Sequence, residues 1–218
     1  MRRYWIAACF ALVVVQGQAF AVDPTPNTPK DPVNNPQTGK VAEDKAEVLE
    51  QKAAAVKEGE ATPAKAEPIS SVEVQAVDPA GAAPVDDPIT CMARTIYWEA
   101  KGAKDADMEA VASVVMNRLG HDGFPDTVCG VVKQGSEKKA CQFSWWCDGR
   151  SDQVQEAVEY DVAKEIARKA LNKSLPDRTK GAMYFHDRNV KPDWAKEYIR
   201  TTETGKFMFY KPRDGAAK

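Results

Sequence analysis

The fold of this chain is decided by one stretch, Asp87-Pro-Ile-Thr-Cys-Met-Ala-Arg-Thr-Ile-Tyr-Trp-Glu-Ala-Lys-Gly102. Asp87 can cap the N-terminus of a helix, Pro88 suits the first helical position, and Gly102 can end the helix. Apolar residues recur at helical spacing and predict one buried stripe, made of Ile89, Met92, Ala93, Ile96, Tyr97 and Ala100. We therefore expect an amphipathic helix here, with its stripe against the core.

A carboxylate lies at the edge of that stripe. Glu99 follows Ile96 by three residues, so the helix should leave it half-buried. Burial raises the pKa of a carboxyl group, and a carboxylic acid that keeps its proton near neutral pH can serve as a general acid. The alternative is a Glu that reaches solvent or pairs with a Lys or Arg, and periodicity alone favours this alternative.

The first residues of the 218-residue chain resemble a secretory signal. Arg2 and Arg3 precede an apolar run over residues 6–15, and Ala-Phe-Ala at 19–21 matches a small-x-small cleavage site. The apolar run is too short to span a bilayer comfortably, although an uncleaved anchor is the alternative. We expect residues 1–21 to be removed, leaving no membrane span in an exported protein that is periplasmic, wall-associated or secreted.

Residues 22–87 have the composition of a linker. They hold 9 of the 14 prolines, no aromatic residue, and 13 acidic against 6 basic side chains. Such a segment has little apolar surface to bury, so the sequence predicts disorder there, with at most a transient helix over residues 43–58. The folded domain is then expected over residues 88–218.

Four cysteines remain once the first 21 residues are set aside, namely Cys91, Cys129, Cys141 and Cys147. An even number in an exported chain predicts two disulfides. Four cysteines allow three pairings, and their spacing does not choose among them.

Beyond the first helix, the domain pattern predicts mostly helices and a small sheet, an α+β fold. Helices are expected over residues 105–119, 126–134 and 152–172, a strand over 182–186, and a hairpin from 198–201 and 206–210. The inward face of the long third helix is expected to consist of Val158, Val162, Ile166, Ala170 and Leu171.

Five short motifs of this domain, in the same order, resemble the SleB-type cell wall hydrolases. They are Ala93-Arg-Thr-Ile-Tyr-Trp-Glu-Ala100, Val114-Val-Met-Asn-Arg118, Phe124-Pro-Asp-Thr-Val-Cys129, Cys141-Gln-Phe-Ser-Trp145 and Gly181-Ala-Met-Tyr-Phe-His186, followed by Trp194. Each motif is weak alone, but the ordered set is specific and covers about residues 89–210. The Pro-rich linker and the four cysteines depart from the spore-cortex enzymes and argue against a spore role.

The resemblance implies a lysozyme-like fold that cleaves peptidoglycan between N-acetylmuramic acid and N-acetylglucosamine. It also implies that Glu99 is the catalytic acid, in a lytic transglycosylase that uses the C6 hydroxyl of the substrate as nucleophile. The alternative is a hydrolytic muramidase of the same fold, which needs a second carboxylate. Asp148 and Asp187 lie beside two of the motifs, although exposed loop carboxylates are the commoner interpretation of both.

The same motifs contain the candidate substrate-binding residues, Gln142, Ser144, Trp145, Tyr184 and His186. Short polar groups can hold N-acetyl and hydroxyl substituents, and a flat ring can cover a sugar face. Tyr184 and His186 alternate with Phe185, so the two should share one face of a strand. Trp145 and Phe143 could instead fill the core beside a disulfide, and His186 could be structural.

Other chemistries have little support in the sequence. His121 and His186 are the only histidines and fit no metal-ligand pattern, and no glycine-rich phosphate loop is present, so we expect neither metal nor cofactor. The formal net charge of −2 gives no sign of a nucleic-acid partner, and we expect a monomer. Two other classes stay open: a papain-like peptidase using Cys91 and His186, and a non-catalytic wall-binding domain.

Overall fold

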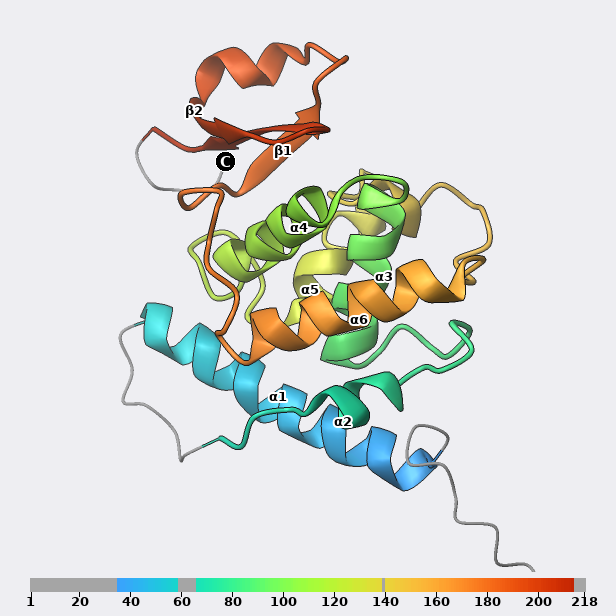
Figure 1. Ribbon diagram of the computed structural model, residues 1–218. Coiled ribbons are helices and arrows are strands. Elements are labelled where there is room, and N and C mark those ends of the chain that lie inside the picture. The colour runs from blue at the N-terminus through green and yellow to red at the C-terminus, as the bar shows by residue number, and fades with distance from the viewer. Residues whose placement is uncertain (1–34, 59–65, 139, 214–218) are drawn as a thin grey trace, which may run out of the picture.

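The computed structural model describes residues 35–58, 66–138 and 140–213, and it confirms the α+β class (Figure 1). The α-helices are α1 (Pro36–Glu58), α2 (Ser71–Gln75), α3 (Pro88–Ala100), α4 (Asp105–Arg118), α5 (Val128–Lys133) and α6 (Ala157–Leu171). The 3₁₀ turns are η2 (Ser136–Lys138), η3 (Ser144–Trp146) and η4 (Asp193–Glu197), and the strands are β1 (Tyr184–Asp187), β2 (Ile199–Glu203) and β3 (Phe207–Lys211). The expected signal at residues 1–21 lies outside the described residues. Within the described ranges, no helix is both long and apolar enough to cross a bilayer.

Helix α3 is the centre of the helical layer. It contacts α1, α4, α5 and α6, and 11 of its 13 residues are buried, which makes it the core element that the sequence predicts. Asp87 caps it, because the carboxylate accepts a hydrogen bond of 2.9 Å from the Thr90 backbone N–H, and Pro88 occupies the first turn.

A three-stranded antiparallel sheet in the order β1-β3-β2 lies against one end of the helical layer (Figure 1). Phe185 on β1 pairs with Phe209 on β3, and its ring lies 5.0 Å from that of Phe207. The turn between β2 and β3 is tied to α4, since Asp107 accepts hydrogen bonds from the Thr204 hydroxyl and, at 2.8 Å, from the Lys206 backbone N–H. The sheet is therefore fixed to α4, which packs against the helix α3 that carries Glu99.

The prediction of a disordered linker over residues 22–87 is wrong for its described part. Residues 36–58 form α1, which packs against α2, α3 and α6. Its buried face recurs at helical spacing and consists of Ala42, Ala46, Leu49, Ala53 and Ala54. The prediction failed because average composition hides a narrow stripe of small residues that buries well against a neighbouring helix.

A buried ion pair ties the second half of the expected linker to the core. The Asp78 carboxylate accepts hydrogen bonds from Arg94 at 2.7 and 2.9 Å and from the Tyr160 hydroxyl at 2.7 Å. Both charged side chains are at most 2% exposed, so removal of either partner would leave a buried charge uncompensated. Residues 66–87 thus belong to the same folded unit as α3 and α6.

The four cysteines form two disulfides, which supplies the pairing that the sequence leaves open. Cys91 on α3 is bonded to Cys129 on α5, and Cys141 is bonded to Cys147 around η3. The first closes a sequence separation of 38 residues and the second a separation of 6. The second bond closes the loop that contains η3, and η3 contacts α3.

Helix α1 is also held by a buried acid. The Glu50 carboxylate accepts a hydrogen bond of 2.7 Å from the backbone N–H of Val128, the first residue of α5. Burial raises the pKa of Glu50 to about 7, although this hydrogen bond lowers it. The folded protein therefore holds this proton more tightly than the unfolded chain, and stability is lost as the pH rises from about 4.5 to 7.

We expect Glu50→Gln to stabilise the protein at pH 8 by at most about 3 kcal/mol and to have little effect at pH 4.5. The amide oxygen can still accept from Val128, but no charge is buried. Urea unfolding at both pH values measures the difference, with Asp44→Asn, at an exposed position on the same helix, as the control. A destabilised Glu50→Gln at pH 8 would show that the ionised carboxylate is needed for docking of α1.

Candidate functional site

Glu99 lies in the last turn of α3, half-exposed, at the junction of two pockets. The first, which we call the sheet-side pocket, has a volume of about 520 Å³ and includes Glu99, Arg118, Gln142, Ser144, Tyr184 and His186 in its lining. The second, the loop-side pocket, has a volume of about 440 Å³ and is lined by Trp98, Glu99, Ser144, Trp145, Asp148 and Asp152 among others. Glu99 and Ser144 belong to both, so the carboxyl group has open space on either side.

The surroundings of Glu99 favour its protonated form near neutral pH. Burial raises its pKa to about 7, while the charges of Lys206 and Arg118 and the Ser144 backbone N–H lower it. Lys206 also donates a hydrogen bond of 2.6 Å to the backbone carbonyl of Glu99. The group can therefore give up a proton, and two nearby cations stabilise the carboxylate that results.

Arg118, the last residue of α4, is a buried cation in the sheet-side pocket. Only 2% of it is exposed, and its Nε donates a hydrogen bond of 2.7 Å to the Met183 carbonyl. Its Nη1 is buried and has no hydrogen-bond partner among the described residues. Its guanidinium carbon lies within 5.0 to 5.5 Å of three ring centroids, those of Phe124, Phe143 and Tyr184. Burial lowers the pKa of Arg118 to about 10, so it stays charged at neutral pH with a donor left for a ligand.

The structure brings four of the five candidate substrate-binding residues into the sheet-side pocket with Glu99. Gln142 and Ser144 come from the segment held by the second disulfide, and Tyr184 and His186 come from β1. Aromatic rings continue the wall, since the Tyr184 ring lies 4.6 Å from that of Tyr198 and 6.1 Å from that of Trp194. Polar groups and flat rings together suit a carbohydrate.

His186 uses both ring nitrogens within the protein. Nδ1 lies 2.8 Å from the Asp187 carbonyl, and Nε2 lies 3.0 Å from the Tyr210 hydroxyl. A carbonyl can only accept, so Nδ1 carries a proton, and Nε2 shares a hydrogen bond with the Tyr210 hydroxyl. His186 therefore shapes the pocket wall through its ring rather than through an available nitrogen.

The prediction that Trp145 offers an open ring to a sugar is corrected. Trp145 is only 5% exposed, and its indole N–H is buried without a hydrogen-bond partner in the described part of the chain. The ring is buried because η3 turns it toward the core, as it does for the neighbouring Phe143. In the loop-side pocket the more exposed aromatic residue is Trp98, next to Glu99.

The two carboxylates considered as a second catalytic group lie on opposite sides of Glu99. Asp187 lines the sheet-side pocket, and its Oδ1 accepts from the Asn189 backbone N–H at 2.8 Å. Asp148 lines the loop-side pocket, and its Oδ1 accepts from the Arg150 backbone N–H at 2.8 Å. Both share a pocket with Glu99, so neither is merely a distant loop carboxylate.

A peptidase built on Cys91 is contradicted by the structure. The sulfur of Cys91 is bonded to Cys129, and the residue is fully buried. A cysteine nucleophile must be an accessible thiolate. The α3 position that could lower a thiol pKa is used instead for a disulfide.

Sequence reasoning missed several residues of the site. It named Arg118 only as the last residue of a motif, without a role, and it did not single out Lys206 or Tyr198. The available signal for Arg118 was its place within one of the family motifs. Lys206 lies 107 residues from Glu99 in sequence, so only the fold brings them together.

Comparison with known proteins supports the family resemblance that the sequence motifs suggest. A family model described as Cell Wall Hydrolase matches residues 102–210. The chain is 30% identical over 129 residues to a spore cortex-lytic enzyme of Halalkalibacterium halodurans, covering 57% of this chain and 34% of that protein. It is 33% identical over 124 residues to a spore cortex-lytic enzyme of Oceanobacillus iheyensis, covering 56% and 41%. The matched part thus spans less than half the length of these curated relatives.

Two solved structures are also similar. One is the catalytic domain of the Bacillus cereus SleB protein, with a TM-score of 0.47 and 27% identity over 57% of this chain and 89% of that one. The other is the catalytic domain of a germination-specific lytic transglycosylase, SleB from Bacillus anthracis, with a TM-score of 0.46 and 27% identity over 57% and 93%.

Proposed function

The chain belongs to the Cell Wall Hydrolase family, and from that premise we propose that it cleaves the glycan strands of peptidoglycan with Glu99 as the catalytic acid. The matched range begins at Gly102, just after Glu99, so the role of Glu99 rests on its surroundings. The observation that carries it is a carboxyl group with a pKa near 7 at the junction of two pockets.

The proposed reaction breaks the bond from C1 of N-acetylmuramic acid to the oxygen of N-acetylglucosamine. Glu99 gives its proton to that oxygen as the bond breaks. The C6 hydroxyl of the same muramic acid then bonds to C1, and its proton returns to the Glu99 carboxylate. No water is consumed, and the muramic acid ends as a 1,6-anhydro sugar.

The pockets on either side of Glu99 support cleavage within a strand. A sugar polymer cut in its interior must be held on both sides of the broken bond, and the sheet-side and loop-side pockets offer room for this. In this proposal Gln142 and Ser144 hold an N-acetyl group near C1, which their place in the sheet-side pocket with Glu99 supports. Arg118 offers its buried Nη1 to an oxygen of the substrate.

A hydrolytic muramidase is the second candidate. It is favoured by the positions of Asp187 and Asp148, each in one of the pockets that contain Glu99. Either carboxylate could activate a water on the far side of the sugar. The lytic transglycosylase is preferred because it needs a single acid, and neither aspartate lies within the motifs that resemble the family.

We also propose that the protein acts outside the cytoplasm, on peptidoglycan as its partner. Two disulfides form readily only in an oxidising compartment, and residues 1–21 have the pattern of a signal peptide. Fractionation of cells that express the full chain should give a mature protein starting at Val22 with no free thiol.

The release of soluble muropeptides from purified peptidoglycan sacculi tests the proposed function. We expect the full chain to solubilise sacculi over time. Binding to sacculi without release would instead identify a non-catalytic wall-binding domain, and release of free stem peptides alone would identify an amidase or peptidase.

A further inference from the structure

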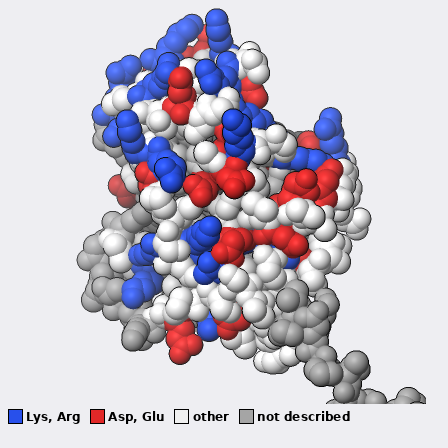
Figure 2. Space-filling model, in the orientation of Figure 1, with Lys and Arg blue, Asp and Glu red and all other residues white. Residues whose placement is uncertain are grey.

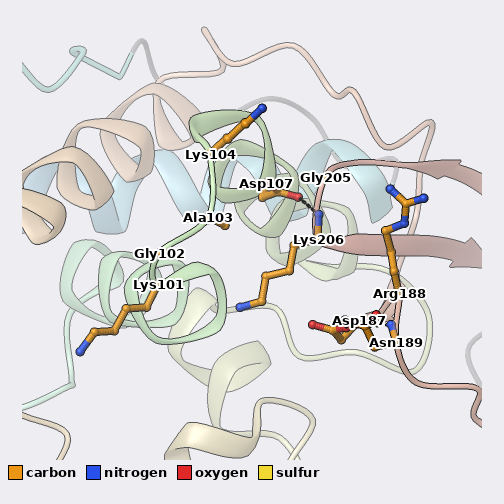
Figure 3. A pocket seen from close by; sticks show the side chains of 10 residues that line it. All are labelled: Lys101, Gly102, Ala103, Lys104, Asp107, Asp187, Arg188, Asn189, Gly205 and Lys206. Atoms are coloured by element: carbon orange, nitrogen blue, oxygen red, sulfur yellow. Dashed lines mark hydrogen bonds between the residues drawn. The ribbon is translucent and has the colours of Figure 1, made fainter.

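A third pocket, which we call the basic pocket, adjoins the site. It has a volume of about 860 Å³ and lies between the α3–α4 connection and the turn that joins β2 to β3. Figure 3 shows Lys101 and Lys104 on one wall, Arg188 on the opposite wall and Lys206 between them. Four basic side chains thus lie around a space next to Glu99, with the charged ends of Lys101 and Lys104 turned outward in this view.

Three of these cations have no carboxylate partner. Lys101 pairs with Glu156 at 2.7 Å, but no ion pair among the described residues includes Lys104, Arg188 or Lys206. Arg188 donates to the Thr204 carbonyl at 3.2 Å. Lys206 donates to the Glu99 carbonyl. Neutral carbonyls leave the positive charges uncompensated, so the pocket favours an anion.

The two acids of the basic pocket are already engaged. Asp107 is 2% exposed, and its carboxylate accepts from the Lys206 backbone N–H and the Thr204 hydroxyl. Asp187 accepts from the backbone and side-chain nitrogens of Asn189 at 2.8 and 2.9 Å. These donors are neutral, so both acids keep their negative charges, but no ion pair among the described residues joins them to the cations around them, and the four cations outnumber the two acids.

The basic pocket is continuous with the sheet-side pocket. Lys206 and Asp187 line both, and Lys206 also contacts the backbone of Glu99. The lobe above the helices, residues 181–213, carries seven Lys and Arg against four Asp and Glu, and Figure 2 shows these cations gathered over it. An anionic group attached to a sugar beside Glu99 would therefore meet this surface.

We propose that the basic pocket binds the carboxylates of the peptide stem that is attached to muramic acid. The inference rests on the proposed function, because it takes the occupant of the sheet-side pocket to be a peptidoglycan strand. The sugar rings themselves carry no charge, and the anionic groups of such a strand are the carboxylates of its stems. The protein thus prefers strands whose stem carboxylates are free over strands whose stem carboxylates are converted to neutral amides.

The test measures binding rather than turnover. Soluble glycan fragments are prepared with stems, and a matched set has the stem carboxylates converted to neutral methylamides. Titration of the full-length protein carrying Glu99→Gln, which prevents turnover, gives a dissociation constant for each. We expect about tenfold tighter binding of the set with free carboxylates, as for a charge-assisted contact, and a smaller difference at high salt.

The matched variants are Lys104→Gln combined with Arg188→Gln, and Lys191→Gln as an exposed cation of the same lobe outside the basic pocket. The double variant should bind both sets with nearly equal affinity, Arg188→Lys should restore part of the preference, and Lys191→Gln should keep it. Equal affinity of the unsubstituted pocket for both sets would overturn the proposal, as would a double variant that loses affinity for both sets alike. A separate assay tests the proposed function itself. If the protein with Glu99 intact cleaves neither set of fragments, the proposed function is wrong.

Discussion

Replacement of Glu99 by Gln is expected to leave a folded protein that releases muropeptides at least about 10³-fold more slowly. The amide has the size of the carboxyl group but cannot give a proton to the glycosidic oxygen. Because Glu99 is half-exposed and its pKa is raised by burial, the neutral amide should cost no stability. Glu109→Gln is the matched control, since Glu109 is a half-exposed Glu on α4 outside the three pockets described above.

The pH dependence gives a second measure of the same group. A general acid must be protonated to act, and the pKa of Glu99 lies near 7. The rate should therefore fall as the pH rises above about 7, with the slope of a single deprotonation. If Glu99→Gln releases muropeptides at the normal rate, or if the rate stays constant well above pH 8, Glu99 is not the catalytic acid.

Replacement of Arg118 by Met is expected to lower kcat/KM by about 10- to 100-fold, the loss that follows from removing a hydrogen bond with a charged donor. The buried Nη1 has no partner among the described residues, so the substrate is its proposed acceptor. Arg118→Lys should recover only part of the loss, because the ammonium cannot keep the bond to the Met183 carbonyl and also reach the substrate.

A shift in the pH profile separates this role from a structural one. The charge of Arg118 lowers the pKa of Glu99, so its removal should raise that pKa and move the alkaline limb of the rate profile to higher pH. Unfolding midpoints measured in parallel account for the lost bond to Met183. If the Arg118→Met protein is less stable but its kinetics and the alkaline limb of its rate profile are unchanged, Arg118 serves only to link α4 to the residue before β1.

The helix that carries Glu99 could be read from sequence because its signals are local. Asp87 caps it, the apolar stripe repeats at helical spacing, and the structure confirms a helix over Pro88–Ala100. Arg118 and Lys206 could not be assigned in this way. Their importance comes from where α4 ends and where the β2–β3 turn returns to α3, and both are long-range features.

The face of α6 shows how tertiary contacts override a periodic pattern. The sequence predicts Val158 and Val162 as inward residues, but they are 74% and 38% exposed. The helix instead turns Tyr160 inward to reach the buried carboxylate of Asp78. The pattern failed because the Asp78 partner lies in a segment whose composition indicates disorder.

The mass of the products tests the central claim most directly. Peptidoglycan is digested with the full chain and with its Glu99→Gln variant, and the muropeptide ends are identified by mass spectrometry. The account predicts 1,6-anhydro-muramic ends, about 18 Da (one water) lighter than hydrolysed ends, from the first protein and none from the variant. Reducing muramic ends would contradict the transglycosylase reaction and turn attention to Asp187 and Asp148, and reducing glucosamine ends would contradict the choice of bond.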